Sequence, residues 1–403
     1  MIDDCMHDDY RSIPQETSEL FKKHYVTLPE EAVDESLNKG DDLNLAKLIE
    51  EKLANVEVKF DAVIGSTGVI SNSTAVAVSK SGGRGMSGNT IDRFEEMVME
   101  KAGPIITVNI PDGARKSLNL LFANSARGLA VRVIVIVGKG AKLSLLEWYT
   151  SYGDSPSFSG VVHRLEADEN SDIEINALHS ERKSTIVASY FSNSAGENAA
   201  IRVNSVYIGG SHDRVRNEFN ADSHGSSIEA NEIVFGSGEQ KFDLMSKISN
   251  SGAHSRAVLN SGAAMDESST CFLKGYAKIN HGAKLATSNI HQEGLLLSRD
   301  SKILALPDMS IDESDVKATH SASAGPLDDD KLFYMMARGI DIKNSKELVT
   351  TAFLTKVVSK IRDPVAKELA LSMVAKKISD GSFGGLPEIK SVGVWETAEH
   401  KKR

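Results

Sequence analysis

The sequence predicts a mainly β protein with helical segments at both ends. From about residue 139 to 325, short strand-like runs alternate with clusters of turn-forming residues. These turns recur roughly every 13–17 residues, and GKGAKL (138–143) is echoed by HGAKL (281–285). Repeated short strands with an internal echo favour a solenoid, in which each rung buries its inner face on the next rung. A large antiparallel sandwich also fits this pattern.

The first part of the chain divides into two segments. Residues 1–57 carry apolar residues at helix spacing and are expected to form a helical region. Residues 58–135 are expected to be a mixed α/β entry to a β core that runs to 326, with a helix in IDRFEEMVMEKA (91–102). The apolar, β-branched run LAVRVIVIVG (129–138) predicts a buried strand.

Within the β region, glycine, asparagine and aspartate mark the ends of the expected strands. The predicted turns lie near Asn170, Gly196, Gly209, Gly225, Gly236, Gly238, Gly252, Gly282 and Asp300.

After residue 326 the periodicity becomes helical. Residues 327–381 are expected to form helices, and 382–403 a tail. One helix should open at Asp328 and end before Gly339, and Asn344 with Glu347 has the spacing of a capping box for the next. Asp363-Pro364 predicts the start of a third helix. The second helix should bury an apolar stripe made of Leu354, Val357, Val358 and Ile361.

Charge and composition argue against several classes of protein. The chain has 56 acidic and 46 basic residues and a net charge of −10, whereas a nucleic-acid binder needs a basic surface. Two cysteines, Cys5 and Cys271, cannot build a disulfide framework. The acidic N-terminus lacks an apolar signal core, and no apolar run reaches the ~18 residues of a membrane span. We therefore expect a cytoplasmic protein that contacts no membrane.

Two alternatives from other classes remain, a nucleotide-binding enzyme and a β-helical binding or carbohydrate-active protein. Gly83, Gly85 and Gly88 form a G-x-G-x-x-G between a strand-like run and an expected helix, the context of a dinucleotide-binding loop. The following segment does not continue as βαβ units, so a surface loop is favoured. A carbohydrate-active β-helix would need an aromatic groove, and the chain has only Trp148 and Trp395. No G-x-x-x-x-G-K-[ST] loop occurs, so the chain is not expected to hydrolyse ATP itself.

One histidine and one cysteine stand out as candidate site residues. His320 ends the β region among small residues that leave an imidazole accessible, and imidazole is a good iron ligand. The alternative is a hydrogen bond within a turn. Cys271 lies in a strand-like run, where free cysteine is commonly buried and inert. Cys5 has acidic neighbours, which disfavour a reactive thiolate.

Several separated blocks resemble the SufB/SufD family, the scaffold subunits of the SUF iron–sulfur cluster assembly system. The resemblance covers roughly residues 130–378, with the closest blocks GKGAKLSLLEWYTS, AKINHGAKLATSNIHQEGLLLS and LFYMMARGI (332–340). Gln292 stands where SufB-type chains carry cysteine, and Ser321 stands where they carry glutamate. Ala318-Thr319-His320 replaces the Cys-Ser-His of SufD-type chains. The chain therefore resembles SufD and keeps the family histidine as His320.

This resemblance implies a fold and a role. The fold would be a right-handed parallel β-helix flanked by helices. The role would be that of a non-catalytic scaffold, without a tightly bound cofactor of its own, that pairs with a SufB-type subunit or with a second copy of itself. His320 would be one ligand of a transient cluster at that interface. The C-terminal helices would bind a SufC-type ABC ATPase through Phe333, Tyr334, Arg338, Gly339, Ile340, Phe353 and Leu354.

Overall fold

The computed structural model describes residues 58–65, 68–71, 73–80, 95–96, 98–99, 103–124, 128–152 and 155–380. The expected helical region at 1–57, the glycine loop at Gly83–Gly88, Cys5 and the tail at 382–403 lie outside these residues. Of the helix expected at 91–102, residues 95–96 and 98–99 are described, and they are helical.

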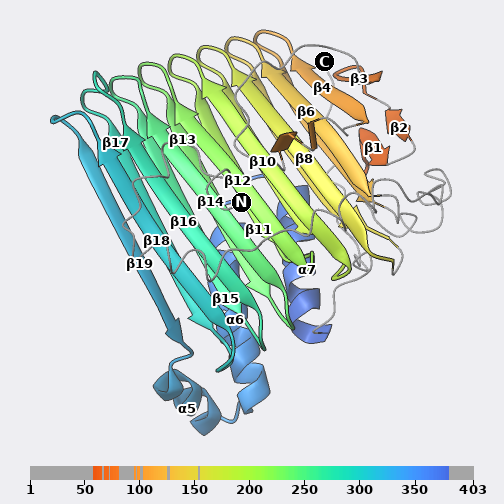
Figure 1. The fold of residues 1–403 in the computed structure, drawn as a ribbon, viewed down its shortest axis with the longest axis vertical. Coiled ribbons are helices and arrows are strands. Elements are labelled where there is room, and N and C mark those ends of the chain that lie inside the picture. Colours follow the sequence, from red (N-terminus) through yellow and green to blue (C-terminus); the bar gives the residue numbers. More distant parts are fainter. Residues whose placement is uncertain are drawn as a thin grey trace, which may run out of the picture.

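The described chain winds into a parallel β-solenoid whose successive strands alternate between two facing sheets (Figure 1). Odd-numbered strands from β5 onward form one sheet and even-numbered strands from β4 onward form the other. The ten-stranded sheet contains β19 (Lys317–Pro326), β17 (Thr287–Leu296), β15 (Arg256–Met265), β13 (Ser227–Gly236), β11 (Ala200–Tyr207), β9 (Asp172–Ser180), β7 (Lys142–Ser151), β5 (Arg115–Asn124), β1 (Ala62–Gly65) and β2 (Gly68–Ser71). The nine-stranded sheet contains β18 (Lys302–Ile311), β16 (Thr270–Ile279), β14 (Lys241–Asn250), β12 (His212–Ala221), β10 (Thr185–Ala195), β8 (Ser157–Ala167), β6 (Leu129–Val137), β4 (Pro104–Ile110) and β3 (Val76–Lys80).

The repeat length explains the turn spacing seen in the sequence. Asp172 pairs with Ala200, which pairs with Ser227 on the next strand of the same sheet. Each rung contains two strands and two turns, so the spacing between successive turns is half the length of the repeat. The mainly β solenoid is confirmed, and the sandwich is excluded because the pairs from β4 and β5 onward within each sheet are parallel.

The turns that lead from an even-numbered to an odd-numbered strand, from β4–β5 to β16–β17, each contain a left-handed backbone conformation. The residues with positive φ in this row of turns are Gly113, Gly140, Asn170, Asn198, Gly225, His254, Gly282 and Leu285. Glycine and asparagine adopt this conformation at little cost, whereas leucine does so only under the constraint of the rungs beside it. The amide of Leu285 donates to Asp315 O in the next turn of the row at 2.7 Å, which supplies such a constraint.

The two ends of the solenoid differ. At the first end the pairs β1–β2 and β3–β4 are antiparallel, so the parallel rungs stop there against reversed strands. At the other end, β18 and β19 are the last strands of their sheets, each bonded to one neighbour among the described strands. Their side chains are half-buried or exposed, unlike those of β16, which are mostly buried.

The solenoid interior is filled by alternate residues of each strand. In β6, the strand predicted to be buried, Val131, Val133 and Val135 are fully buried in the main core cluster. Aromatic rings on successive rungs stack on one another, with centroid distances of 4.5 Å for Tyr149–His179 and 4.8 Å for His179–Tyr207.

Three helices follow the last strand: α5 (Asp329–Ala337), α6 (Ile342–Val358) and α7 (Pro364–Asp380). Asp328 caps α5 by accepting hydrogen bonds from two backbone N–H groups, and Gly339 has a φ of +87° after it, as predicted. Asp363 caps α7 ahead of Pro364, also as predicted. The predicted capping box was wrong. Asp341 caps α6 and accepts from the Asn344 N–H, so the helix begins earlier, and Glu347 faces Lys343 in its first turns.

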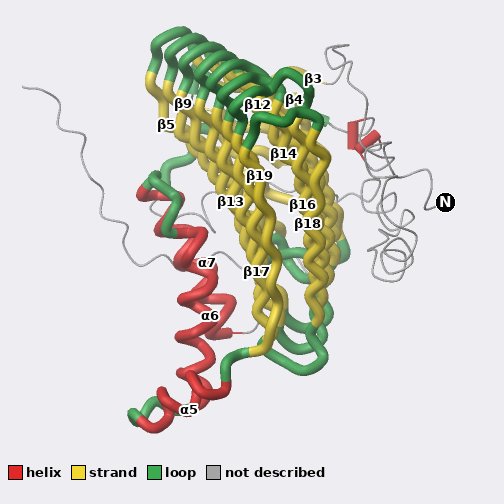
Figure 2. Tube along the Cα trace, turned by 90° about the vertical axis from the view of Figure 1, so that its left-hand side faces the viewer, coloured by secondary structure: helices red, strands yellow, loops and turns green. Residues whose placement is uncertain are grey.

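Helices α6 and α7 lie along the outer face of the ten-stranded sheet (Figure 2). The predicted apolar stripe is confirmed, since Leu354, Val357, Val358 and Ile361 are all buried. They join residues of α7 and outward-facing residues of the sheet, such as Trp148 and Ile233, in one hydrophobic cluster. This packing holds the helices to the solenoid wall.

Candidate functional site

His320 lies on β19, the terminal strand of the ten-stranded sheet, and its side chain is exposed. It pairs in register with Ile290 of β17, which is buried in the main core cluster. Residues in register on neighbouring strands face the same side of a sheet. His320 therefore continues an inward-facing column of side chains at the point where the solenoid ends. The imidazole is covered by no further rung among the described residues.

The residues on either side of His320 are tied to β17 on the opposite face of the sheet. The Thr319 hydroxyl donates to Asn289 Oδ1 at 2.8 Å. The Ser321 hydroxyl lies 2.7 Å from His291 Nδ1. Two side-chain bridges thus bracket the histidine on a strand that, among the described strands, is paired on one side only.

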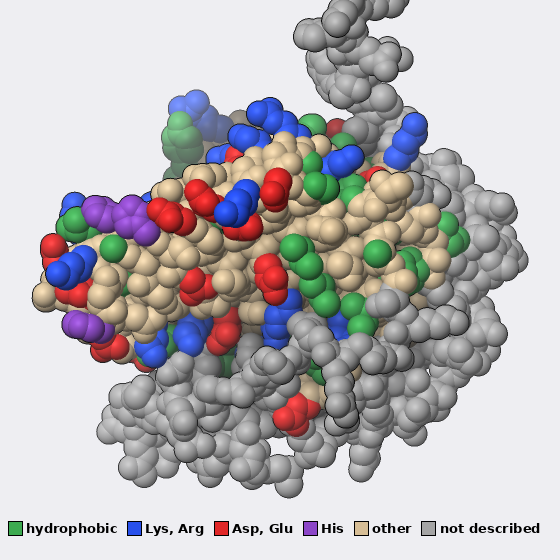
Figure 3. Space-filling model, turned by 90° about the horizontal axis from the view of Figure 1, so that it is seen from above, with side chains coloured by type: hydrophobic (Ala, Val, Ile, Leu, Met, Phe, Trp, Pro, Cys, Tyr) green, Lys and Arg blue, Asp and Glu red, His purple; other side chains and the backbone are tan. Residues whose placement is uncertain are grey.

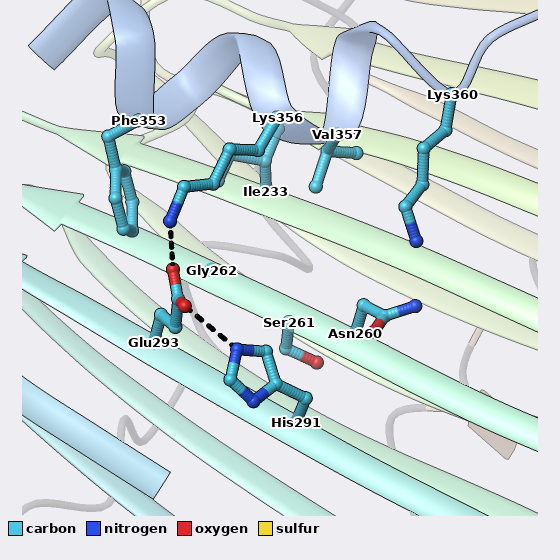
Figure 4. Close-up of a pocket in the computed structure, with 10 residues that line it drawn as sticks. All are labelled: Ile233, Asn260, Ser261, Gly262, His291, Glu293, Phe353, Lys356, Val357 and Lys360. Carbon is cyan, nitrogen blue, oxygen red and sulfur yellow. Dashed lines mark hydrogen bonds and ion pairs between the residues drawn. The ribbon is translucent and has the colours of Figure 1, made fainter.

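Beyond His291, the hydrogen bonds continue to helix α6 (Figure 4). His291 Nε2 lies 2.8 Å from Glu293 Oε1, and Lys356 Nζ donates to Glu293 Oε2 at 2.6 Å. The hydrogen bond from Lys356 is the main cause that holds the pKa of Glu293 below its ordinary value. Glu293 is therefore an ionised carboxylate at neutral pH.

A cavity of about 140 Å³ opens beside this chain of groups, between α6 and the sheet. Its wall includes Phe353 and Val357 of the helix and Ile233 of β13 (Figure 4). Gly262 lies on the sheet side of the cavity. A Cβ at this position would lie 2.6 Å from Ile233 Cδ1, so any larger residue would displace that side chain.

Charged side chains and histidines gather over the row of turns seen from above (Figure 3). His224 and His254 meet edge to face there, with ring centroids 5.2 Å apart, and His224 Nδ1 lies 3.9 Å from Glu197 Oε1. Among the described residues, no group of three or more histidine, cysteine, aspartate or glutamate side chains could hold a metal ion. A metal bound at His320 would need further ligands from outside the described chain.

Polar groups also occupy the middle of the solenoid interior. Glu232 accepts hydrogen bonds from Asn217, Ser246 and Ser261 at 2.7, 2.6 and 2.9 Å, yet burial raises the pKa of its carboxyl. His163 Nε2 lies 3.1 Å from Glu147 Oε1, and both side chains are buried. Sequence reasoning missed these groups because they are far apart in the chain and carry no motif.

Cys271 and Gln292, the position where SufB-type chains carry cysteine, are both buried. Cys271 is buried on β16, as predicted, and desolvation raises the pKa of its thiol well above the ordinary value. Gln292 is buried on β17, and its Nε2 donates to Leu273 O at 3.4 Å.

The residues predicted to bind a partner divide into two groups. Phe333 and Tyr334 are 70% and 59% exposed on α5, and the Arg338 guanidinium lies 4.9 Å from the centre of the Tyr334 ring. Phe353 and Leu354 pack instead toward the solenoid wall, and Leu354 is fully buried. Gly339 and Ile340 line a groove of about 590 Å³ between the start of α6 and the end of α7.

Residues 120–353 match the family model described as "SUF system FeS cluster assembly, SufBD core domain". The match covers more than half of the chain, from β5 into α6. The chain belongs to the SufBD family. Its expected likeness to that family, whose model is described as one of iron–sulfur cluster assembly by the SUF system, is therefore confirmed.

Curated SufBD relatives include two proteins named "Iron-sulfur cluster assembly protein SufD". The one from Bacillus subtilis is 32% identical over 162 residues, which are 40% of this chain and 37% of the relative. The one from Escherichia coli is 20% identical over 298 residues, or 72% of this chain and 70% of the relative. A SufBD family protein of Pyrococcus horikoshii is 22% identical, with 66% of this chain and 58% of the relative covered. The SufD-like character is thus supported by the relatives, although the first of them is matched over little more than a third of its length.

The described fold bears on the alternative of a dinucleotide enzyme and on the expected absence of a membrane span. The dinucleotide enzyme depended on a doubly wound sheet, and the described residues form a solenoid instead. None of the helices in the described part of the chain has the length and apolar character to cross a membrane.

Proposed function

We propose that this chain is a non-catalytic scaffold subunit of a SUF complex, which pairs with a SufB-type subunit and a SufC-type ATPase to build and transfer nascent iron–sulfur clusters. The observation that carries the proposal is the position of His320, exposed on the terminal strand at the open end of the solenoid. A histidine at that place can be shared with a second protein, whereas one within the rungs could not.

The open end favours a partner that completes the sheets. Edge strands present unpaired backbone groups that readily pair with another chain. The inner face of β18 adds half-buried apolar side chains, including Ile303 and Met309, that a further rung would cover. Ile311, at the end of the same strand, is 45% exposed. A SufB-type solenoid, or a second copy of this chain, would bury these groups by docking its own terminal strands here.

A single imidazole at the interface suits transient binding. Neutral imidazole is a good ligand for iron, but one ligand cannot hold a cluster by itself. The remaining ligands would come from the partner, so the nascent cluster is held only while the two subunits are together. Separation of the subunits would leave it with an incomplete ligand set and favour its transfer. In this scheme the cluster is the cargo of the complex and not a resident cofactor.

The helices after the last strand offer a separate surface for the ATPase. Phe333 and Tyr334 are large apolar side chains that α5 presents to solvent, as aromatic anchors of an interface would be. The groove beside Gly339 and Ile340 continues this surface between α6 and α7. Leu354 would serve the contact indirectly, by fixing α6 to the solenoid.

The test is reconstitution of the complete complex with iron and sulfide under anaerobic conditions. We expect His320→Ala to lower the iron and acid-labile sulfide bound per complex severalfold, because the cluster loses a ligand. Cys271→Ser is the matched control, since its thiol is buried within the rungs and should not contribute. Equal iron content in His320→Ala and wild type would remove the ligand assignment. A loss in Cys271→Ser alone would move the site into the solenoid interior.

A further inference from the structure

A continuous set of hydrogen bonds joins helix α6 to the strand that carries His320. It runs from Lys356 to Glu293, from Glu293 to His291, and from His291 to Ser321. The three distances are 2.6, 2.8 and 2.7 Å, and the shortest joins an ammonium to a carboxylate, a charge-assisted pair that forms shorter bonds than neutral groups do. These groups come from three elements that are distant in the sequence, namely α6, β17 and β19.

The chemistry of these groups defines one arrangement of donors and acceptors. The Glu293 carboxylate can only accept, so His291 Nε2 carries the hydrogen that it donates to Glu293. In a neutral imidazole the other nitrogen, Nδ1, is then free to accept from the Ser321 hydroxyl. Each group thus orients the next, and the ammonium of Lys356 keeps the carboxylate in place.

The terminal strand is where such a weak constraint has most effect. An interior strand is held on both sides, whereas β19 is held along β17 alone among the described strands. Ser321 is adjacent to His320 in the chain, so any shift of Ser321 moves the imidazole as well. The cavity beneath α6 means that the helix is incompletely packed against the sheet at this place, so the hydrogen bond of Lys356 is one of few contacts there.

We propose that Lys356, Glu293, His291 and Ser321 form a relay through which helix α6 sets the position of His320 on the terminal strand. They are positioning residues, and none of them is assigned as a ligand. A protein that docks on the C-terminal helices would then alter the geometry of the histidine without touching it. The purpose of this coupling rests on the proposed function, but the coupling itself is a property of this chain alone.

The decisive measurement is amide hydrogen exchange of the segment 317–326 in the full chain without partners. Lys356→Met and Ser321→Ala should each speed exchange in this segment about two- to fivefold, the range expected when an exposed polar pair is lost at a one-sided strand. Ser321→Thr keeps the hydroxyl and should restore the wild-type rate.

Lys360→Met is the matched control for the helix. Lys360 lies one turn further along and donates to Glu229 and Asn231 on β13, which are not part of the relay. It should leave segment 317–326 unchanged. If Lys356→Met leaves β19 as protected as in wild type, or if Lys360→Met loosens it equally, the relay is refuted.

Iron loading of the complex separates this inference from the proposed function. Lys356→Met should lower the iron retained without lowering the amount of SufB-type partner bound. If exchange responds as expected but iron loading is independent of His320, the relay stands and the ligand assignment fails. If iron loading depends on His320 but hydrogen exchange in β19 is unchanged by Lys356→Met, the relay fails and the ligand assignment stands.

Discussion

Lys377 is a buried lysine that locks α7 to the solenoid, and its removal should loosen that helix. Its side chain is 1% exposed. The ammonium donates to Phe235 O at 2.5 Å, to Gln240 Oε1 at 2.7 Å and to Ile208 O. It also lies 5.3 Å from the centre of the Phe235 ring. Desolvation lowers the pKa of Lys377 well below its ordinary 10.5.

The cost of Lys377→Met can be worked out from these contacts. Methionine fills a similar volume, but two buried backbone carbonyls lose a donor, at about 1–3 kcal/mol each. Gln240 loses less, since its Oε1 also accepts from the Ser237 N–H at 3.1 Å. Removing an amine from a desolvated site offsets part of this loss. We therefore expect α7 docking to weaken by about 2–4 kcal/mol at neutral pH.

The pKa shift adds a dependence on pH. Between the lowered pKa in the folded state and the ordinary value in the unfolded state, the unfolded chain binds more protons at this site. Stability therefore rises with pH through that window in wild type, and this rise should be absent in Lys377→Met. The difference in stability between the two proteins should consequently widen toward pH 10.

The assay is denaturant titration followed by the fluorescence of Trp148. This indole is buried in the cluster that also contains Met373 and Val374 of α7. Trp395→Phe in every protein leaves Trp148 as the single indole of the chain. Lys346→Met, at an exposed lysine of α6, is the control. If Lys377→Met unfolds at the same denaturant concentration as this control, the proposed lock does not exist.

Further outcomes follow from other buried and exposed groups. Burial raises the pKa of Asp213 well above 3.8, so its contribution to stability is lost as pH rises through the folded-state pKa. Asp213→Asn should remove this fall, which begins above about pH 4, in thermal melts. Truncation after Pro326 should abolish capture by a SufC-type ATPase. The double variant Phe333→Ala with Tyr334→Ala should do the same in the full chain. If this double variant binds the ATPase as wild type does, the docking surface lies away from α5. Gly262→Ala should lower stability by at most about 1 kcal/mol, because its methyl group meets only the end of the Ile233 side chain, which borders the cavity beneath α6.

The repeat of the fold could be predicted because its signal is local. Turn residues such as Asn170 and Gly225 need a left-handed backbone, and that need is visible in residue type alone. The same holds for Asp328 and Asp363 as helix caps. The start of α6 was missed because Asn344 is itself a good cap residue. The real cap, Asp341, lies only two residues after Gly339, where the sequence indicated the end of α5.

The candidate site could be predicted only in part. His320 was found because the family resemblance marks it, while its exposure on a terminal strand is a property of where the rungs stop. The relay could not be found from the spacing of residues, because its members lie far apart in the sequence. Glu293 and Lys356 are 63 residues apart, and His291 and Ser321 are 30 residues apart. These residues are brought together by the strand register within the sheet and by the packing of α6. Neither of these can be predicted from a short sequence motif.

The two ends of the solenoid differ in a way that fits the proposed role of His320. Reversed strands close the first end, so further parallel rungs cannot be added there without removing β2 and β3. The last end stops in register, where β18 leaves half-buried apolar residues and both β18 and β19 have an edge that pairs with no further strand among the described residues. A partner that docks there gains buried apolar surface and backbone hydrogen bonds whether or not metal is present. Cluster binding at His320 would then add only a small part of the affinity between the subunits. A complex held together in this way does not depend on the cluster for its assembly, so the subunits can separate and release the cluster.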